Sequence, residues 1–86
     1  MKVAYLEQEE VMSVMSSQLK QIREGIGLSL EGLARRSGIS ARTVRNAEDG
    51  KRVSFDTAVQ ILQGLNSALS DVGKQPVSID DLNLVV

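Results

Sequence analysis

Cysteine and histidine are both missing from this sequence of 86 residues, and its aromatic side chains are limited to one tyrosine and one phenylalanine. Without cysteine or histidine the chain has no ligand set for a zinc finger, no disulfide framework, no thiol nucleophile and no Ser-His-Asp triad. We therefore expect no metal and no cofactor. An enzyme is the least expected class, because no general-base cluster or phosphate loop is evident. With Tyr5 and Phe55 as the only aromatics, the core must be aliphatic.

Long apolar runs are also missing. No segment approaches the roughly 20 apolar residues needed to span a bilayer, and the N-terminus lacks a signal-peptide pattern. A reducing cytoplasm is therefore the expected location. The composition, 42% apolar and 24% charged, is typical of one soluble globular domain with a small core. We expect a single domain over residues 1–86, with its core in residues 11–69.

Apolar residues recur with helical spacing in the first third of the chain. They form a stripe at intervals of three or four residues, which predicts an amphipathic helix over about residues 9–24. The stripe consists of Val11, Met15, Leu19, Ile22 and Ile26. Gly25 and Gly27 are suited to ending this helix.

Three serines mark the starts of later helices, because serine is a favoured N-cap residue. The predicted caps are Ser29, Ser40 and Ser54. The second helix is expected to end near Ser37 and the third near Glu48, each shortly before a glycine. The apolar positions of the fourth helix are Phe55, Ala58, Ile61, Leu62, Leu65 and Leu69. Residues 78–81 have the spacing of a capping box and predict one further helical turn.

Gly64 lies inside the fourth helix, where a glycine costs roughly 1 kcal/mol relative to alanine. Its presence there indicates that another helix packs closely at this position. Taken together, the patterns predict an all-α fold, a compact bundle of about five short helices.

Only four residues, Ser37-Gly38-Ile39-Ser40, separate the second helix from the third. Glycine suits a turn with a positive φ, and Ile39 can fill the angle between the two helices. A turn this short makes the helices cross steeply, which leaves the third helix with one packed side and one free side. At about 100° per residue, the packed side holds Thr43, Val44 and Ala47. The free side holds Ala41, Arg42, Arg45 and Asn46.

Positive charge is concentrated in the middle of the chain, although the net charge is −1. Residues 35–52 hold six basic groups against two acidic ones, whereas residues 1–34 and 53–86 are acidic on balance. The basic groups are Arg35, Arg36, Arg42, Arg45, Lys51 and Arg52. A surface that carries these groups together is suited to binding phosphates. The alternative is that the groups belong to a solvated charged loop.

The free side of the third helix carries groups that match the edges of DNA bases. Arginine can bond both acceptors of guanine, asparagine can match the donor and acceptor of adenine, and a small alanine can touch a thymine methyl. The major groove is wide enough to admit one α-helix. The pattern therefore favours a third helix that faces DNA bases.

Seven short motifs lie between residues 19 and 65, in the order and at the spacings of one known family, with no insertion or deletion between them. They are Leu19-Lys20-Gln21-Ile22-Arg23, Leu28-Ser29, Leu33-Ala34, Gly38-Ile39-Ser40, Thr43-Val44, Glu48-Asp49-Gly50-Lys51-Arg52 and Ile61-Leu62-Gln63-Gly64-Leu65. Together they resemble the helix-turn-helix family of phage Cro proteins and repressors, often called the Xre family. The resemblance implies a lambda-repressor-like fold and a sequence-specific regulator of transcription, with repression as the expected action.

The resemblance also implies roles for individual residues. The base-contacting positions are Ala41, Arg42, Arg45 and Asn46, of which Arg45 matches a position that contacts either a base or a phosphate. The phosphate-contacting positions are Ser40, Thr43, Lys51 and Arg52. Arg23 and Glu48 match a structural salt bridge between the first and third helices. The family often has a glutamine that contacts a phosphate at the start of the second helix, where this sequence has Leu30. Arg35 or Arg36 is the expected replacement for that contact.

A homodimer on a double-stranded DNA operator is expected, because one module recognises only a few base pairs and the family places two third helices about 34 Å apart. The extensions 1–10 and 70–86 are the candidate dimer contacts. The apolar residues of the tail either fold back over the core or form the dimer contact. They are Val77, Ile79, Leu82, Leu84, Val85 and Val86. Residues 3–6 suit an extra helical turn, a strand that pairs across a dimer, or a frayed end.

Two other functions are compatible with the sequence. The antitoxin of a toxin–antitoxin pair would bind a toxin protein as well as DNA, and would regulate its own operon. Some small family members resemble this chain in having a Leu-Gln-x-Leu fourth helix and a short apolar tail. An interaction module without DNA binding is compatible with Leu30 and the acidic total. Retardation of nonspecific DNA at low salt separates that module from the other two functions.

Overall fold

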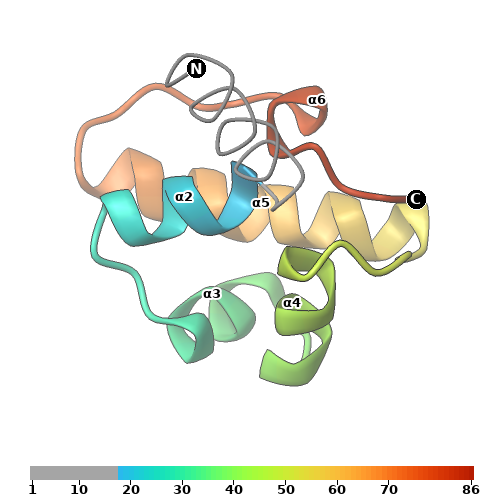
Figure 1. Ribbon diagram of the computed structural model, residues 1–86. Helices are drawn as coiled ribbons and strands as arrows, with labels where there is room; N and C mark the ends of the chain where they lie inside the picture. Colours follow the sequence, from blue (N-terminus) through green and yellow to red (C-terminus); the bar gives the residue numbers. More distant parts are fainter. Residues whose placement is uncertain (1–17) are drawn as a thin grey trace, which may run out of the picture.

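The computed structural model describes residues 18–86, and these residues form five α-helices and no strand. The helices are α2 (Gln18–Gly25), α3 (Leu30–Ser37), α4 (Ala41–Glu48), α5 (Phe55–Asp71) and α6 (Ile79–Leu82). The longest of them, α5, crosses the molecule, with α3 and α4 below it and α6 above it in the view of Figure 1. The predicted all-α class is confirmed. The predicted start of the first helix and residues 3–6 lie outside the described residues.

The three predicted serine caps are all in place. The Oγ atoms of Ser29, Ser40 and Ser54 each accept a hydrogen bond from the backbone N–H three residues later, at 2.9, 3.1 and 3.1 Å. These bonds satisfy N–H groups that have no partner inside the helix. At α6 the carboxylate of Asp81 accepts a hydrogen bond from the backbone N–H of Ser78 at 2.8 Å, so the predicted helical turn is also present.

The turn between α3 and α4 has the geometry that its glycine predicts. Gly38 has a φ of 72°, in the left-handed region that glycine adopts without steric cost. The N–H groups of Gly38 and Ile39 donate to the carbonyls of Arg35 and Ala34 at 3.3 and 3.1 Å, which closes the end of α3. The half-buried Ile39 side chain packs against the core between the two helices.

The core is aliphatic, and every described helix contributes to it. The largest fully buried side chains are Leu19, Leu33, Val44, Ile61, Leu65 and Leu82. Leu82 belongs to this core although it lies C-terminal to the residues 11–69 expected to hold it. Phe55 instead lies on the surface, with 59% of its area exposed. None of the helices within residues 18–86 is long and apolar enough to cross a bilayer.

Gly64 lets the end of α3 approach the backbone of α5, which confirms the predicted close packing. A Cβ atom at this position would overlap with Ser37 Oγ and would lie 2.8 Å from the backbone nitrogen of Ser37. Ser37 is buried at this contact, and its Oγ has no hydrogen-bond partner within the described part of the chain. The end of α3 therefore packs directly against α5, because position 64 has no side chain to keep the two helices apart.

The C-terminal tail folds back onto the same chain. Val77, Ile79 and Leu84 are half-buried against the core, on either side of the fully buried Leu82. Of the two arrangements that the sequence left open for these four residues, the structure has the intramolecular one. The last two residues differ, because both valines remain exposed.

Two sets of hydrogen bonds hold the tail in place. The side chain of Asn66 accepts from the N–H of Val77 at 2.8 Å and donates to the carbonyl of the same residue at 3.0 Å. Nearer the end, the carbonyl of Val85 accepts from the N–H of Val53 at 2.8 Å. Because Val53 belongs to the loop between α4 and α5, the tail supports the segment that follows α4.

Candidate nucleic-acid interface

Helix α4 has one buried and one exposed side, as its sequence predicts. Val44 and Ala47 are buried in the core, whereas the side chains of Arg42 and Arg45 point to solvent and are exposed. No ion pair joins either arginine to another residue within the described range. The two guanidinium groups are therefore available to an external ligand from a helix whose backbone is fixed by its opposite side.

The other predicted contact residues of α4 are half-buried. Ala41 packs partly against the core, and Asn46 is partly covered near the C-terminal end of the helix. Thr43, placed on the packed side by its helical angle, is also half-buried. Its Oγ1 lies 2.9 Å from the Oγ of the exposed Ser40, within hydrogen-bond distance. Both hydroxyls thus sit at the N-terminus of α4, where the positive end of the helix dipole favours anions.

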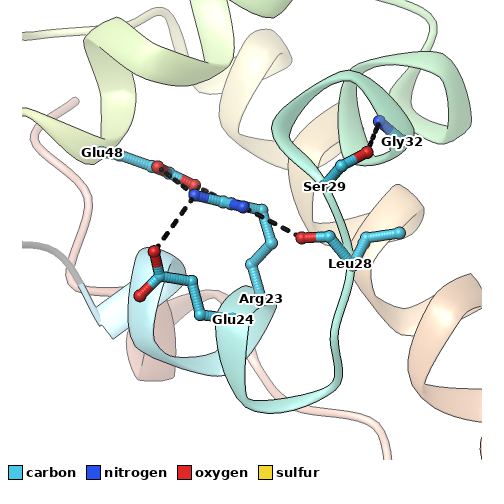
Figure 2. A network of polar contacts seen from close by, with 6 residues as sticks. All are labelled: Arg23, Glu24, Leu28, Ser29, Gly32 and Glu48. Carbon is cyan, nitrogen blue, oxygen red and sulfur yellow. Dashed lines mark hydrogen bonds and ion pairs between the residues drawn. The ribbon is translucent and has the colours of Figure 1, made fainter.

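An ion pair between Arg23 of α2 and Glu48 of α4 fixes the C-terminal end of α4 (Figure 2). Arg23 Nε donates to one carboxylate oxygen of Glu48 at 2.6 Å, and Nη2 donates to the other at 3.1 Å. The Nη1 atom donates to the carbonyl of Leu28 at 2.9 Å. Glu24 lies at the edge of this network, 4.0 Å from Nη2.

Burial makes this ion pair structural. Only 10% of the Arg23 side chain and 5% of the Glu48 side chain are exposed. The hydrogen bonds from Arg23 to Glu48 raise the pKa of the guanidinium, and they outweigh the opposing effect of burial. Because arginine is charged at any ordinary pH, its side of the pair does not titrate. The pair therefore holds α2, α4 and the loop before α3 in one arrangement.

The loop that follows α4 carries two exposed cations, Lys51 and Arg52. Its path is set at both ends. Near α4, the N–H of Lys51 donates to the carbonyl of Asn46 at 3.0 Å, and Gly50 has a φ of 84°. At the far end, Val53 is buried and its N–H is bound by the tail. The two cations therefore extend from a loop with fixed ends, next to the exposed side of α4.

The two candidate replacements for the missing glutamine differ in their surroundings. Arg35 is exposed in the last turn of α3. Arg36 instead points along α5, where it donates to Ser67 Oγ at 3.0 Å and pairs with Asp71 at 2.8 Å. A phosphate contact by Arg36 would require it to leave these partners, so Arg35 is the better placed of the two.

Leu30 lies at the position where the family often has the glutamine, and its half-buried side chain packs against the core. It also lines a polar hollow of about 360 Å³ beside α4. The other lining residues are Lys20, Arg23, Glu24, Arg45, Glu48 and Asp49. Three of these seven residues are acidic, so this flank of α4 is mixed in charge, whereas the loop at its C-terminal end is cationic. No cluster of acidic side chains among residues 18–86 is arranged to hold a metal ion.

Sequence reasoning missed three contacts around this surface. The carbonyl of Leu28 accepts from Arg23, and Ser67 and Asp71 hold Arg36. Every residue has a backbone carbonyl, so the sequence does not show that the carbonyl of Leu28 accepts a hydrogen bond from a side chain. The partners of Arg36 lie 31 and 35 positions away on another helix, beyond any local pattern.

A family model described as helix-turn-helix matches residues 19–72, more than half of the chain. The matched segment begins in α2 and ends just past α5, so it includes both partners of the Arg23–Glu48 ion pair and all of α4. The resemblance predicted from the motifs is thereby confirmed. A search of curated proteins and a search of solved structures each gave no match.

Proposed function

The chain belongs to the Xre/Cro-type helix-turn-helix family of DNA-binding transcription regulators, which is not a family of enzymes, and from this premise we propose that it is a repressor. In this proposal the protein binds a double-stranded DNA operator as a homodimer and inserts α4 of each copy into the major groove. Occupation of the operator excludes the polymerase.

The observation that carries the proposal is the division of α4 into a buried and an exposed side. Val44 and Ala47 hold the helix in the core, and Arg42 and Arg45 extend from the opposite side without acidic partners in residues 18–86. Rigid placement matters because a bidentate contact from arginine to guanine depends on the orientation of its planar group. In the proposal Ala41 and Asn46 contact neighbouring bases.

Phosphate contacts are assigned to groups on both flanks of α4. Ser40 and Thr43 lie at its N-terminus, and Lys51 and Arg52 lie in the loop after it. Arg35 adds an exposed cation from α3. If each of these three cations neutralises one phosphate, the logarithm of the binding constant falls against the logarithm of salt concentration with a slope of about −2.7 for each copy that binds.

The proposed experiment selects bound sequences from a random pool of duplex DNA with the full chain. We expect enrichment of an inverted repeat whose half-sites are centred about one helical turn apart, because two copies related by a two-fold axis contact equivalent bases. Binding of the selected duplex is then measured against salt concentration to obtain the slope. Absence of both enrichment and gel retardation at low salt would refute DNA binding.

A charge control accompanies the selection. Lys74 is an exposed cation that follows α5, outside the proposed contact surface. Lys74→Ala removes one positive charge from the chain, as does Arg52→Ala in the loop after α4. We expect only Arg52→Ala to make the salt slope shallower, by about one phosphate contact. Equal slopes for the two variants would remove Arg52 from the interface.

A further inference from the structure

The loop between α4 and α5 is held from two sides. At its start, the N–H of Lys51 donates to the carbonyl of Asn46 in α4 at 3.0 Å. At its end, the N–H of Val53 donates to the carbonyl of Val85 in the C-terminal tail at 2.8 Å. Arg52 lies between these two bonds, with its side chain exposed. The backbone around this cation is therefore held on one side by α4 and on the other side by the tail.

The tail reaches Val53 because the chain turns directly after α6. Asn83, which follows this helix, has a φ of 55°, in the left-handed region that asparagine tolerates better than most residues. On either side of this turn, Leu82 is fully buried and Leu84 is half-buried against the core. The turn and these apolar contacts hold the carbonyl of Val85 next to the loop.

The contacts that hold α4 itself come from other parts of the chain. Val44 and Ala47 are buried on its inner side, and the ion pair between Arg23 and Glu48 fixes its C-terminal end (Figure 2). Helix α6, in contrast, packs against α2 and α5. Release of residues 83–86 should therefore loosen the loop after α4 and leave the exposed side of α4 in place.

We infer that residues 83–86 are a positioning segment for the DNA contact, and that they act by holding the loop that carries Lys51 and Arg52. The inference rests on the proposed function, in which these two cations contact phosphates. The segment 83–86 has no charged side chain, so it has no cation of its own for a phosphate. Its effect passes through the loop, because a loop that is already ordered loses less conformational entropy when it binds.

This role predicts a change in affinity without a change in sequence preference. Phosphate contacts fix a protein on the duplex and carry no direct sequence information, whereas contacts to base edges carry it. Arg42, which is proposed to contact bases, extends from α4, and the contacts that hold this helix do not include the segment 83–86. Release of the segment should therefore weaken binding to all duplexes by a similar factor.

Two uncharged substitutions in the full chain release the segment, and each has a matched control. Asn83→Val places a β-branched residue at a left-handed position, where it is strained, whereas Asn83→Gly removes the same side-chain amide and keeps the turn. Leu84→Gln removes a half-buried apolar side chain, whereas Val86→Gln makes the same kind of change at a side chain that is 54% exposed. None of the four substitutions changes the net charge.

The first test follows the loop in the absence of DNA. Backbone order parameters from NMR relaxation report motion on the picosecond-to-nanosecond timescale. In Asn83→Val and Leu84→Gln, we expect the order parameter of Arg52 to fall from about 0.85 to below about 0.6, the range of a flexible backbone. The order parameter of Val44 in α4 should not change. Equal values for Arg52 in the releasing variants and in their controls would overturn the inference.

The second test measures binding to a labelled duplex of random sequence at low salt. We expect Asn83→Val and Leu84→Gln to weaken binding about five- to tenfold, because the loop must then be ordered on binding. Their controls should bind like the parent chain. Combined with Lys51→Ala and Arg52→Ala, the releasing substitutions should have little further effect, since the loop no longer carries the cations that the segment positions. An equal loss in both backgrounds would place the effect outside the loop and overturn the inference.

A comparison of two duplexes completes the test and separates the two proposals. The ratio of the affinities for the selected operator and for the random duplex should be the same in the releasing variants as in the parent chain. A reduced ratio would show that the segment positions α4, against the inference. If the unaltered protein binds neither duplex, the proposed function fails, while the order parameters still show whether residues 83–86 hold the loop. If it binds DNA but the releasing variants bind like their controls, the inference fails while the proposed function stands.

Discussion

Two arginines of the helix-turn-helix region have carboxylate partners on neighbouring helices, but their surroundings differ. Arg23 and Glu48 are bound through two hydrogen bonds with 10% and 5% of their side chains exposed, whereas Arg36 and Asp71 are 35% and 61% exposed. Desolvation makes the first pair costly to break, since the partner left behind remains buried and charged. Solvent screens the second pair, so that Arg36 can exchange its partner at little cost.

Arg42 completes the comparison as an arginine without an acidic partner among the described residues. The series from Arg23 through Arg36 to Arg42 runs from a buried arginine to a freely exposed one. The difference teaches that burial, more than the presence of a charge, decides whether an arginine here stabilises the fold or remains available to DNA.

The largest expected effect belongs to the buried pair. Glu48→Ala should lower the free energy of unfolding by about 3–5 kcal/mol, because it leaves the Arg23 guanidinium buried without its carboxylate. Unfolding in urea, monitored by circular dichroism, measures this loss. Arg45→Ala changes an exposed residue of the same helix and should stay within about 0.5 kcal/mol of the parent protein.

A paired replacement sharpens this prediction. Arg23→Met combined with Glu48→Leu removes both charges and keeps apolar side chains of similar size, so it should recover most of the stability lost in Glu48→Ala. A greater loss of stability from Arg45→Ala than from Glu48→Ala would contradict the assignment of the inner and outer sides of α4.

The second-largest effect concerns Arg42, the most exposed arginine of the series, and it is a loss of DNA affinity instead of stability. Arg42→Ala should weaken binding to the selected operator by about 1–3 kcal/mol and relax the base preference at one position of each half-site. Its Tm should stay close to that of the parent chain, since the side chain is exposed. Competition assays with duplexes altered at single base pairs measure the preference. An unchanged preference would show that Arg42 contacts no base.

The smallest effect belongs to the solvated pair. Asp71→Ala should change the free energy of unfolding by less than about 1 kcal/mol, because both side chains are partly hydrated. Release of Arg36 should also strengthen binding to nonspecific DNA slightly at low salt, provided that Arg36 reaches a phosphate. Titration of a labelled nonspecific duplex compares the two proteins. Asp56→Ala, which removes an exposed carboxylate at the other end of α5, is the control for net charge.

Features that depend on neighbouring residues in the sequence were predictable here. The three serine caps, the turn at Gly38 and the two sides of α4 follow from local backbone chemistry and helical angle, and all are present. Gly64 was predictable as well, because a glycine inside a helix needs a reason such as the backbone of α3 lying against it.

Features that depend on partners far apart in the sequence could not be predicted from it. Nothing local distinguishes Asn66, which binds the backbone of Val77, from any other polar residue of α5. The exposure of Phe55 was also not predicted: side chains in a helix lean toward its N-terminus, and no helical turn precedes the first residue of α5 to show what its ring would cover. The Arg23–Glu48 pair was assigned by resemblance, since its members lie 25 positions apart.

The docked tail has a consequence for amide hydrogen exchange. Val53 and Val77 belong to no helix, and backbone amides of such segments ordinarily exchange with solvent protons quickly. Here each is bound, one by the carbonyl of Val85 and the other by the side chain of Asn66. Both amide protons should therefore be protected while the tail is docked. Their exchange would report the local opening of the tail separately from the global unfolding that releases the amides of α5.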